Sequence, residues 1–253
     1  MLRPRIDVKD GGAGSFDRRT VWAAVALAAA WLAASVVGFV TTAALLPGLA
    51  PQSRALLVLS GLTVLLVAFL AATDAWRSAR VVATGGRSAW GLLALPLVLV
   101  LAPLVGGVHL PALGPLSILL VGYALTGFTE ETFFRGVVLG VLRPGGAVRA
   151  VVLSSLLFGM VHLGNVFVRP SVALVVAQAV GAVCFGIAYG ALRLRLATIW
   201  PLIALHALHD LLLRVGGLPV VPTDVVQDVV LLIYGIVLLR RPEGGEVPTP
   251  TPA

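Results

Sequence analysis

The sequence predicts an all-α fold: a polytopic membrane helical bundle of about eight transmembrane helices. Of its 253 residues, 59% are hydrophobic and 11% are charged, and the mean hydropathy of +1.04 lies outside the range of ordinary soluble domains. A helix needs about 20 residues to cross a hydrocarbon core of about 30 Å. Apolar stretches of this kind recur along the chain, at residues 20–46, 55–73, 89–108, 115–142, 147–168, 171–192, 199–214 and 223–239.

The distribution of basic residues predicts the orientation of these helices. All but three of the 18 lysines and arginines fall on the side of the membrane that holds both chain ends, and the exceptions are Arg54, Arg169 and Arg214. Because cytoplasmic loops carry the excess of Lys and Arg, both termini are predicted to be cytoplasmic. The net charge of +7 does not indicate nucleic-acid binding, since the basic residues lie between the spans and not in a patch with interleaved aromatic residues.

The chain is expected to divide into four parts. Residues 1–19 and 241–253 are polar, charged or rich in Pro and Gly, so both are expected to be disordered cytoplasmic segments. Residues 20–110 hold the first three spans. The first span is longer than a signal-peptide core and is expected to be retained, and two prolines inside the third predict a kink. Residues 111–240 hold the remaining spans and form the predicted catalytic core.

Three of the later spans carry ionisable side chains, which are costly in lipid and therefore indicate a functional site. The first set is Glu130-Glu131 with Arg135. Adjacent residues on a helix point about 100° apart, so the two glutamates cannot do the same job. Glu131 and Arg135 have the spacing of four at which a carboxylate meets a guanidinium on one helix face. Glu130 is then the free carboxylate, a usable base for activating water in a poorly hydrated site.

The second set is Phe158 and His162, which share a helix face where aromatic packing can fix the orientation of the imidazole. Glu130 lies 13 residues before the arginine that precedes a Pro-Gly-Gly turn, and His162 lies 13 residues after the arginine that follows it. A helical hairpin through this turn would bring Glu130 and His162 to one depth, roughly 20 Å from those arginines.

The third set is His206, His209 and Asp210. At positions i, i+3 and i+4, His206 and Asp210 project from nearly the same helix face, with His209 offset. This spacing suits two ligands of one ion or two donors to one oxyanion. Asp224 and Asp228 lie near the start of the last span, where acidic residues favour a helix amino terminus.

Together these motifs resemble, in order, those of the intramembrane CAAX-protease and bacteriocin-processing family, which includes the type II CAAX prenyl endopeptidases and the lysostaphin-resistance-like proteins. The segment from Glu130 to Arg135 is similar to the family's E-E-x-x-x-R motif, that from Phe158 to His162 to its F-x-x-x-H motif, and that from His206 to Asp210 to its H-x-x-x-(Asn or Asp) motif. The resemblance extends from the fourth span to the seventh. It implies hydrolysis of a peptide bond within the membrane by a glutamate-activated water, in an all-helical bundle of eight spans.

The residues and the resemblance give compatible roles. Glu130 and His162 would polarise the attacking water, while His206 and Asp210 would face the developing oxyanion or hold an ion. Glu131 with Arg135 would brace the base. The supporting residues are therefore Glu131, Arg135, Phe158 and His209.

The role of Asp210 and the presence of a metal are left open by the sequence. The prenyl proteases carry Asn at the position of Asp210, and ionised Asp only accepts hydrogen bonds. Asp210 could instead orient His206, be protonated, or ligate a metal. Glu130, His162 and His206 are the candidate ligands of a zinc ion with an open position for water, but a metal-free glutamate mechanism uses the same residues.

The predicted function is that of an intramembrane, glutamate-dependent endopeptidase, metal-assisted or not, acting on a membrane-anchored peptide or protein, CAAX-prenylated or not. Two alternatives are a non-catalytic immunity or scaffold protein of the same fold and a proton-coupled transporter that uses the buried carboxylates as a relay. A transporter should show paired broken helices in both halves, whereas the polar residues here lie in the second half. Usage rich in Ala, Gly, Val and Arg with a single Lys favours a bacterial plasma membrane. The expected partners are the bilayer and the substrate.

Overall fold

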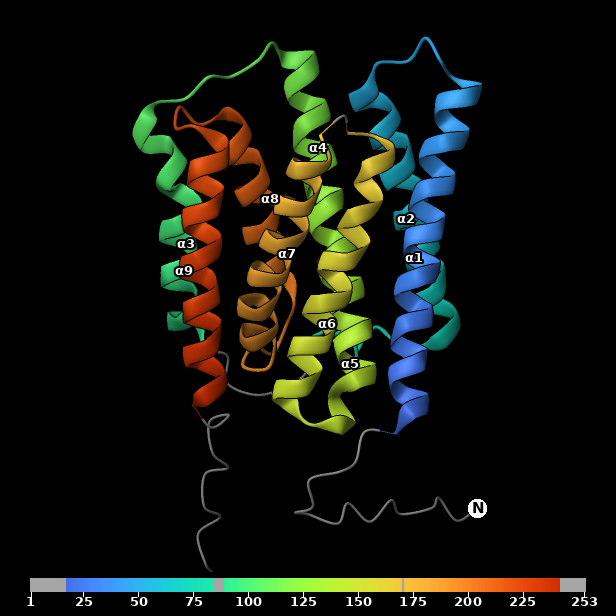
Figure 1. The fold of residues 1–253 in the computed structure, drawn as a ribbon, viewed down its shortest axis with the longest axis vertical. Coiled ribbons are helices and arrows are strands. Elements are labelled where there is room, and N and C mark those ends of the chain that lie inside the picture. Colours follow the sequence, from blue (N-terminus) through green and yellow to red (C-terminus); the bar gives the residue numbers. More distant parts are fainter. Residues whose placement is uncertain (1–16, 84–88, 170, 242–253) are drawn as a thin grey trace, which may run out of the picture.

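The computed structural model describes residues 17–83, 89–169 and 171–241, and over these ranges it is an all-helical bundle (Figure 1). An isolated bridge between Val108 and Gly216 is the one β-type pairing in the described residues. The predicted disordered ends, residues 1–19 and 241–253, lie almost entirely outside those ranges. The first helix already begins inside the first of them, where the side chain of Asp17 accepts a hydrogen bond from the backbone N–H of Arg19 at 3.0 Å.

Six helices, or continuous runs of helix, are long and apolar enough to cross a membrane within the described chain. The remaining helical elements, at residues 90–106 and 200–215, are shorter. The six are α1 (Arg18–Leu45), α2 (Pro51–Thr73), the run formed by α4 (Leu113–Glu130), the π-helix η3 (Glu131–Val138), α5 (Leu139–Leu142) and η4 (Arg143–Gly145), the run formed by α6 (Ala147–His162) and η5 (Leu163–Phe167), α7 (Val172–Arg193) and α9 (Val220–Arg240).

The third and seventh predicted spans are helical but shorter than a bilayer requires. The third is broken into η1 (Trp90–Leu93), α3 (Ala94–Leu101) and η2 (Ala102–Gly106), and Pro103 stands at the start of η2, where the α-helix gives way to a tighter 3₁₀ turn. The seventh, α8 (Trp200–Val215), has 16 residues and therefore spans about 24 Å. It packs mainly against α4 and α3, and Trp200 and Leu208 on its outer face are 50% and 38% exposed.

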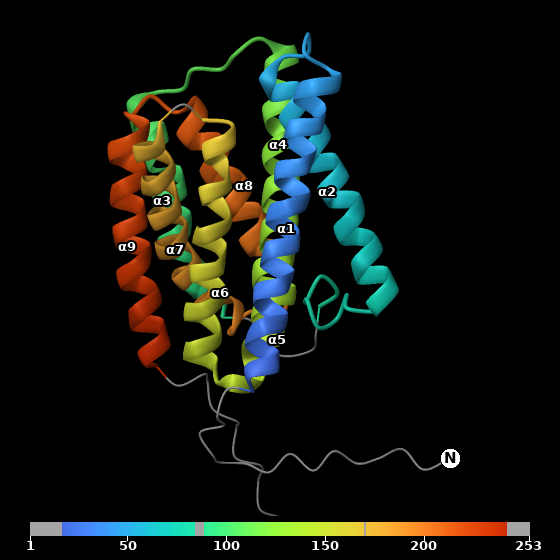
Figure 2. The same ribbon diagram turned by 45° about the vertical axis from the view of Figure 1, so that its right-hand side comes forward.

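The two ends of the described chain, at the start of α1 and the end of α9, lie at the same end of the bundle (Figure 1). The hairpin at η4 between α5 and α6 lies at this end too, as Figure 2 also shows. This arrangement agrees with an even number of crossings. That this end is the cytoplasmic one stays a prediction from the placement of Lys and Arg.

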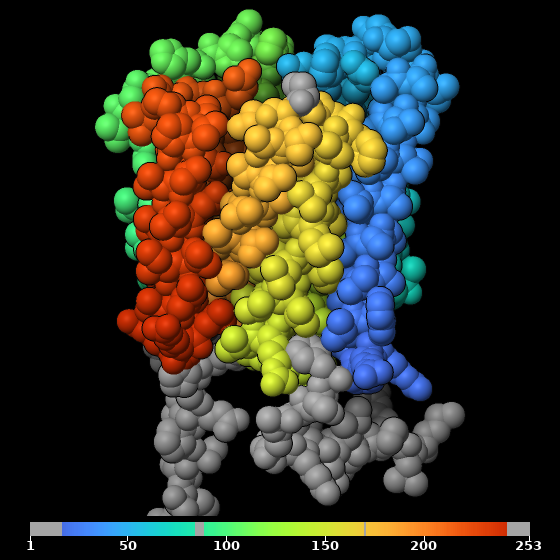
Figure 3. All heavy atoms as spheres, in the orientation of Figure 1, coloured from blue at the N-terminus to red at the C-terminus, as the bar shows by residue number. Residues whose placement is uncertain are grey.

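The outside of the bundle is apolar. On α9, Val225, Val229, Ile233 and Val237 form a stripe at intervals of four residues, each between 38% and 57% exposed. Helices α9, α7, α6 and α1 lie side by side on the face seen in Figure 3. An exposed apolar surface of this extent is unfavourable in water but matches a hydrocarbon environment, so the chain is a multi-pass integral membrane protein.

Close approach of α4 and α8 depends on Gly127. A Cβ atom at this position would lie 2.6 Å from the carbonyl oxygen of Ile203 and 3.1 Å from the backbone nitrogen of Ala207. Both atoms belong to the backbone of α8 and cannot rotate away. The absence of a side chain therefore sets the distance between the two helices, as small residues do in membrane bundles.

We predict that Gly127→Ala destabilises the protein by about 1–3 kcal/mol, because the added methyl group overpacks the contact between α4 and α8. Thermal unfolding in detergent measures the change. Gly122→Ala on the same helix is the matched control, since a Cβ there meets no atom within 4 Å. Equal unfolding temperatures for the two variants would contradict this account of the packing.

Candidate active site

Glu130, His162 and His206 come together from three helices. The Oε2 atom of Glu130, at the end of α4, lies 4.0 Å from Nε2 of His162 at the end of α6. The same oxygen lies 3.8 Å from Nε2 of His206, near the middle of α8. The hairpin at η4 returns α6 alongside α5 and η3, so the predicted common depth of Glu130 and His162 is what the structure has. One carboxylate oxygen thus faces two imidazole nitrogens.

The adjacent glutamates have different surroundings. Glu131 is fully buried, and its Oε1 lies 3.2 Å from Nη1 of Arg135 and 2.7 Å from Nδ1 of His206. The side chain of Glu130 is 19% exposed and lines a cavity. Glu131 is therefore held by two partners, while Glu130 is the carboxylate that a water molecule can reach.

Hydrogen bonds orient both imidazole rings. Nδ1 of His162 lies 2.8 Å from the carbonyl oxygen of Phe158, and because a carbonyl only accepts, Nδ1 carries the proton. Nδ1 of His206 likewise donates to the carboxylate of Glu131. In each ring the other nitrogen, Nε2, is directed toward Glu130. A histidine whose first nitrogen is committed in this way presents a defined second nitrogen to the site.

The contact between Glu131 and His206 was not foreseen in the sequence, which indicates Arg135 alone as the partner of this glutamate. The helix is also π-helical from Glu131 to Val138, a widened turn that frequently occurs at functional sites. No feature of the local sequence indicates this turn. The contact joins η3 to α8, which lie far apart in the chain and whose relative register is set by packing.

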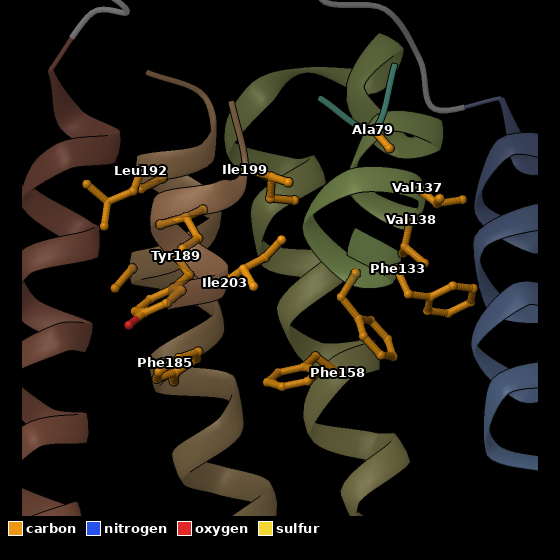
Figure 4. Close-up of a cluster of buried hydrophobic side chains, with 14 of the residues drawn as sticks. Ala79, Phe133, Val137, Val138, Phe158, Phe185, Tyr189, Leu192, Ile199 and Ile203 are labelled. Atoms are coloured by element: carbon orange, nitrogen blue, oxygen red, sulfur yellow. The ribbon is translucent and has the colours of Figure 1, made fainter. Parts of the chain in front are cut away.

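Aromatic rings enclose the polar groups. The guanidinium carbon of Arg135 lies 4.0 Å from the ring centroid of Phe158 and 5.5 Å from that of Phe185. Phe158 contacts His162 edge to face at 4.6 Å, and Phe185 stacks on Tyr189 at 3.8 Å. Figure 4 shows Phe158 on α6 and Phe185 and Tyr189 on α7 projecting into the same interior. These rings exclude water and add cation–π attraction to the buried guanidinium.

Asp210 lies at the edge of this arrangement. Its Oδ2 is 3.8 Å from Nε2 of His206, which is beyond hydrogen-bond distance, and its Oδ1 is 3.5 Å from Nδ1 of His209. Nε2 of His209 in turn lies 3.6 Å from Oδ1 of Asp224 on α9. The offset predicted for His209 therefore directs it away from Glu130 and toward the last helix.

The expectation that Asp224 and Asp228 serve the amino terminus of the last helix is wrong. The helix begins at Val220, no acidic residue lies in its first turn, and both side chains line a cavity with His209 and Asp210. The missed signal was their position: two carboxylates four residues apart in a membrane span share a face and indicate function.

Two cavities meet at His162. The first, of about 200 Å³, is mainly apolar, lies among α1, α2, α4 and α6, and is lined by Glu130, His162 and Trp31 among others. The second, of about 110 Å³, lies among α6, α7, α8 and α9 and is lined by His162, His206, His209 and three aspartates. The candidate site is thus accessible from an apolar side and a polar side.

The three candidate zinc ligands do not have the geometry of a metal site. Zinc lies about 2.0–2.2 Å from its nitrogen and oxygen ligands, so the ligand atoms of a tetrahedral site are about 3.3 Å apart. The distances of 3.8 and 4.0 Å from Glu130 exceed this, and the described residues contain no group of three or more His, Cys, Asp and Glu that could hold an ion.

We predict that Arg135→Met destabilises the protein by about 3–5 kcal/mol, because it leaves the carboxylate of Glu131 buried with one partner fewer. The double variant Glu131→Gln, Arg135→Met should be less destabilised, since both charges are then removed. Thermal unfolding of the two variants in detergent makes the comparison. An Arg135→Met protein as stable as the parent would show that the ion pair does not stabilise the fold.

Comparison with known proteins identifies one family. Residues 111–212 match the family model described as type II CAAX prenyl endopeptidase Rce1-like. The match begins just before α4 and ends within α8, so it contains all three motifs but neither the first three spans nor α9. No curated protein matches the chain in sequence.

Proposed function

We propose, from the match of residues 111–212 to the Rce1-like model of type II CAAX prenyl endopeptidases, that the chain is an intramembrane endopeptidase in which Glu130 activates a water molecule. The family supports protease activity in general. The observation that supports the mechanism is the position of Glu130, the one glutamate of the pair that is partly exposed and that faces two imidazole nitrogens within 4.0 Å.

In the proposed reaction, water is held between Glu130 and His162. Nδ1 of His162 is committed to the carbonyl of Phe158, so Nε2 can accept one hydrogen of the water while Oε2 of Glu130 accepts the other. Glu130 takes the proton as the water oxygen attacks the carbonyl carbon of the scissile bond. The same proton then passes to the leaving amine as the C–N bond breaks, which returns Glu130 to its ionised form.

The proposed site for the oxyanion is beside His206. With Nδ1 donating to Glu131, a protonated His206 donates from Nε2 to the oxygen that becomes negative in the tetrahedral intermediate. Glu131 and Asp210 offset the positive charge of the ring. An ionised Asp210 cannot donate to the oxyanion itself, so its proposed role is to position and neutralise His206.

The proposed substrate is a membrane-anchored peptide or protein. The cavity that leads to Glu130 is lined mainly by apolar side chains of α1, α2 and α6, which suits a lipid anchor or an apolar segment. The family is named for endopeptidases that act on CAAX prenyl proteins, so prenylated peptides are one substrate class to test. A non-catalytic immunity or scaffold role would not require Glu130 to face two histidines at a water-accessible position.

We predict that Glu130→Gln lowers cleavage of a membrane-anchored peptide by a factor of about 10²–10⁴, because an amide cannot accept the proton of the attacking water. Loss of turnover is expected from His162→Ala and His206→Ala as well. Purified protein in lipid nanodiscs, with a peptide labelled on both sides of the scissile bond, gives the rates. Circular dichroism shows that each variant is folded. Undiminished cleavage by Glu130→Gln would overturn the mechanism.

We predict further that cleavage persists after treatment with a zinc chelator and does not rise when zinc is added back. The distances from Glu130 to the two imidazoles exceed those of a zinc site. The assay is the same one, run before chelation, after chelation and after zinc addition. Activity lost to the chelator and restored by zinc would show that the three side chains rearrange around a metal.

A further inference from the structure

Two of the three carboxylates that line the second cavity, those of Asp224 and Asp228, have no part in the proposed reaction. We call the cavity of about 110 Å³ lined by Asp210, Asp224, Asp228, His209 and Gln178 the acidic chamber. Neither Lys nor Arg lines it. Asp224 and Asp228 lie on α9, beyond the segment that matches the family model.

The carboxylate of Asp228 has no polar partner among the described residues. Within the described residues it makes neither a hydrogen bond nor an ion pair, although it lies inside a membrane-spanning helix. It packs directly against α7 at Gly181, where any side chain would collide with its Oδ2 atom. The glycine therefore leaves room for this carboxylate at the wall of the chamber. An unpaired carboxylate in a span is costly unless a cation or water reaches it.

His209 provides an independent indication that a ligand group belongs in the chamber. Its side chain is 9% exposed, and its Nε2 is buried without a hydrogen-bond partner. This nitrogen is directed toward Asp224, whose Oδ1 is 3.6 Å away and too distant for a hydrogen bond. A buried, unpartnered ring nitrogen facing a carboxylate is uncommon because each such group carries a desolvation penalty.

We propose that the acidic chamber binds the cationic side chain of a basic residue, Lys or Arg, in the substrate peptide. Two residues of the candidate active site, His162 and His206, also line the chamber, so a side chain in it belongs to a residue near the scissile bond. The volume corresponds to about three or four water molecules of ~30 Å³ each, which suits the charged end of one side chain. This inference rests on the proposed function, since it identifies a feature of the substrate of that site.

The chamber is better suited to an organic cation than to a metal ion. A divalent ion needs several ligands that converge on one point, and the described residues contain no group of three or more acidic, His or Cys side chains arranged in that way. An ammonium or guanidinium group has several donors and can contact carboxylates that are spread around a wall.

The test measures binding separately from cleavage. The full chain carrying Glu130→Gln, in nanodiscs, is titrated with palmitoylated fluorescent peptides that are identical except that one position carries Lys or its uncharged counterpart norleucine. With the position scanned along the peptide, Lys should bind at least about tenfold more tightly than norleucine at one position. Adding Asp224→Asn and Asp228→Asn should abolish that preference. Adding Asp74→Asn instead, at an exposed residue at the end of α2, should preserve it.

The outcomes separate this proposal from the proposed function. A Lys preference that depends on Asp224 and Asp228 supports the chamber even if the parent protein cleaves none of the peptides. Cleavage without any difference between Lys and norleucine overturns the chamber while the protease assignment stands. Binding of Ca²⁺ or Zn²⁺ that depends on the two aspartates, with no Lys preference, also overturns it. If the double variant binds neither peptide, Gly181→Ala, which displaces Asp228 without changing charge, decides: a retained preference contradicts the proposal.

Discussion

The contacts of Glu131 are the interaction on which the rest of the site depends. This carboxylate has no exposed surface, and it contacts Arg135 one helical turn later and His206 on a different helix. A buried charge in a membrane protein is tolerated only with partners. Moving α8 away from η3 would leave the carboxylate of Glu131 without its contact to His206, and the free-energy cost of that loss holds the two helices together. The contacts of Glu131 therefore also fix the position of the neighbouring residue, Glu130, on the same helical run.

Packing supplies the conditions for that contact. Gly127 lets the backbones of α4 and α8 approach closely, three residues before the glutamate pair. The rings of Phe158 and Phe185 cover the guanidinium of Arg135 and keep water away from the ion pair. Small residues therefore set the distance between helices, and aromatic residues lower the local polarity. Both strengthen the contacts among the charged groups and fix which groups pair.

His162 stands between two different environments. On one side lies a mainly apolar cavity that contains Glu130, and on the other lies the acidic chamber that contains His209 and the aspartates of α9. A membrane-anchored peptide has the same two characters, an apolar anchor and a polar chain. The last helix, which the family match does not reach, supplies two of the three carboxylates of the chamber, and under the proposed function it would contribute to the choice of substrate.

The sequence by itself determined the all-helical membrane fold, the approximate limits of its helices and the pairing of Glu131 with Arg135. These follow from composition and from the periodicity of a single helix, both of which are local. The tertiary structure alone decided that His206 bonds to Glu131 and lies outside hydrogen-bond distance of Asp210, and that His209 faces Asp224. Contacts between helices depend on their relative rotation and depth, which are set by close approaches such as that at Gly127, and no spacing along one helix contains that information.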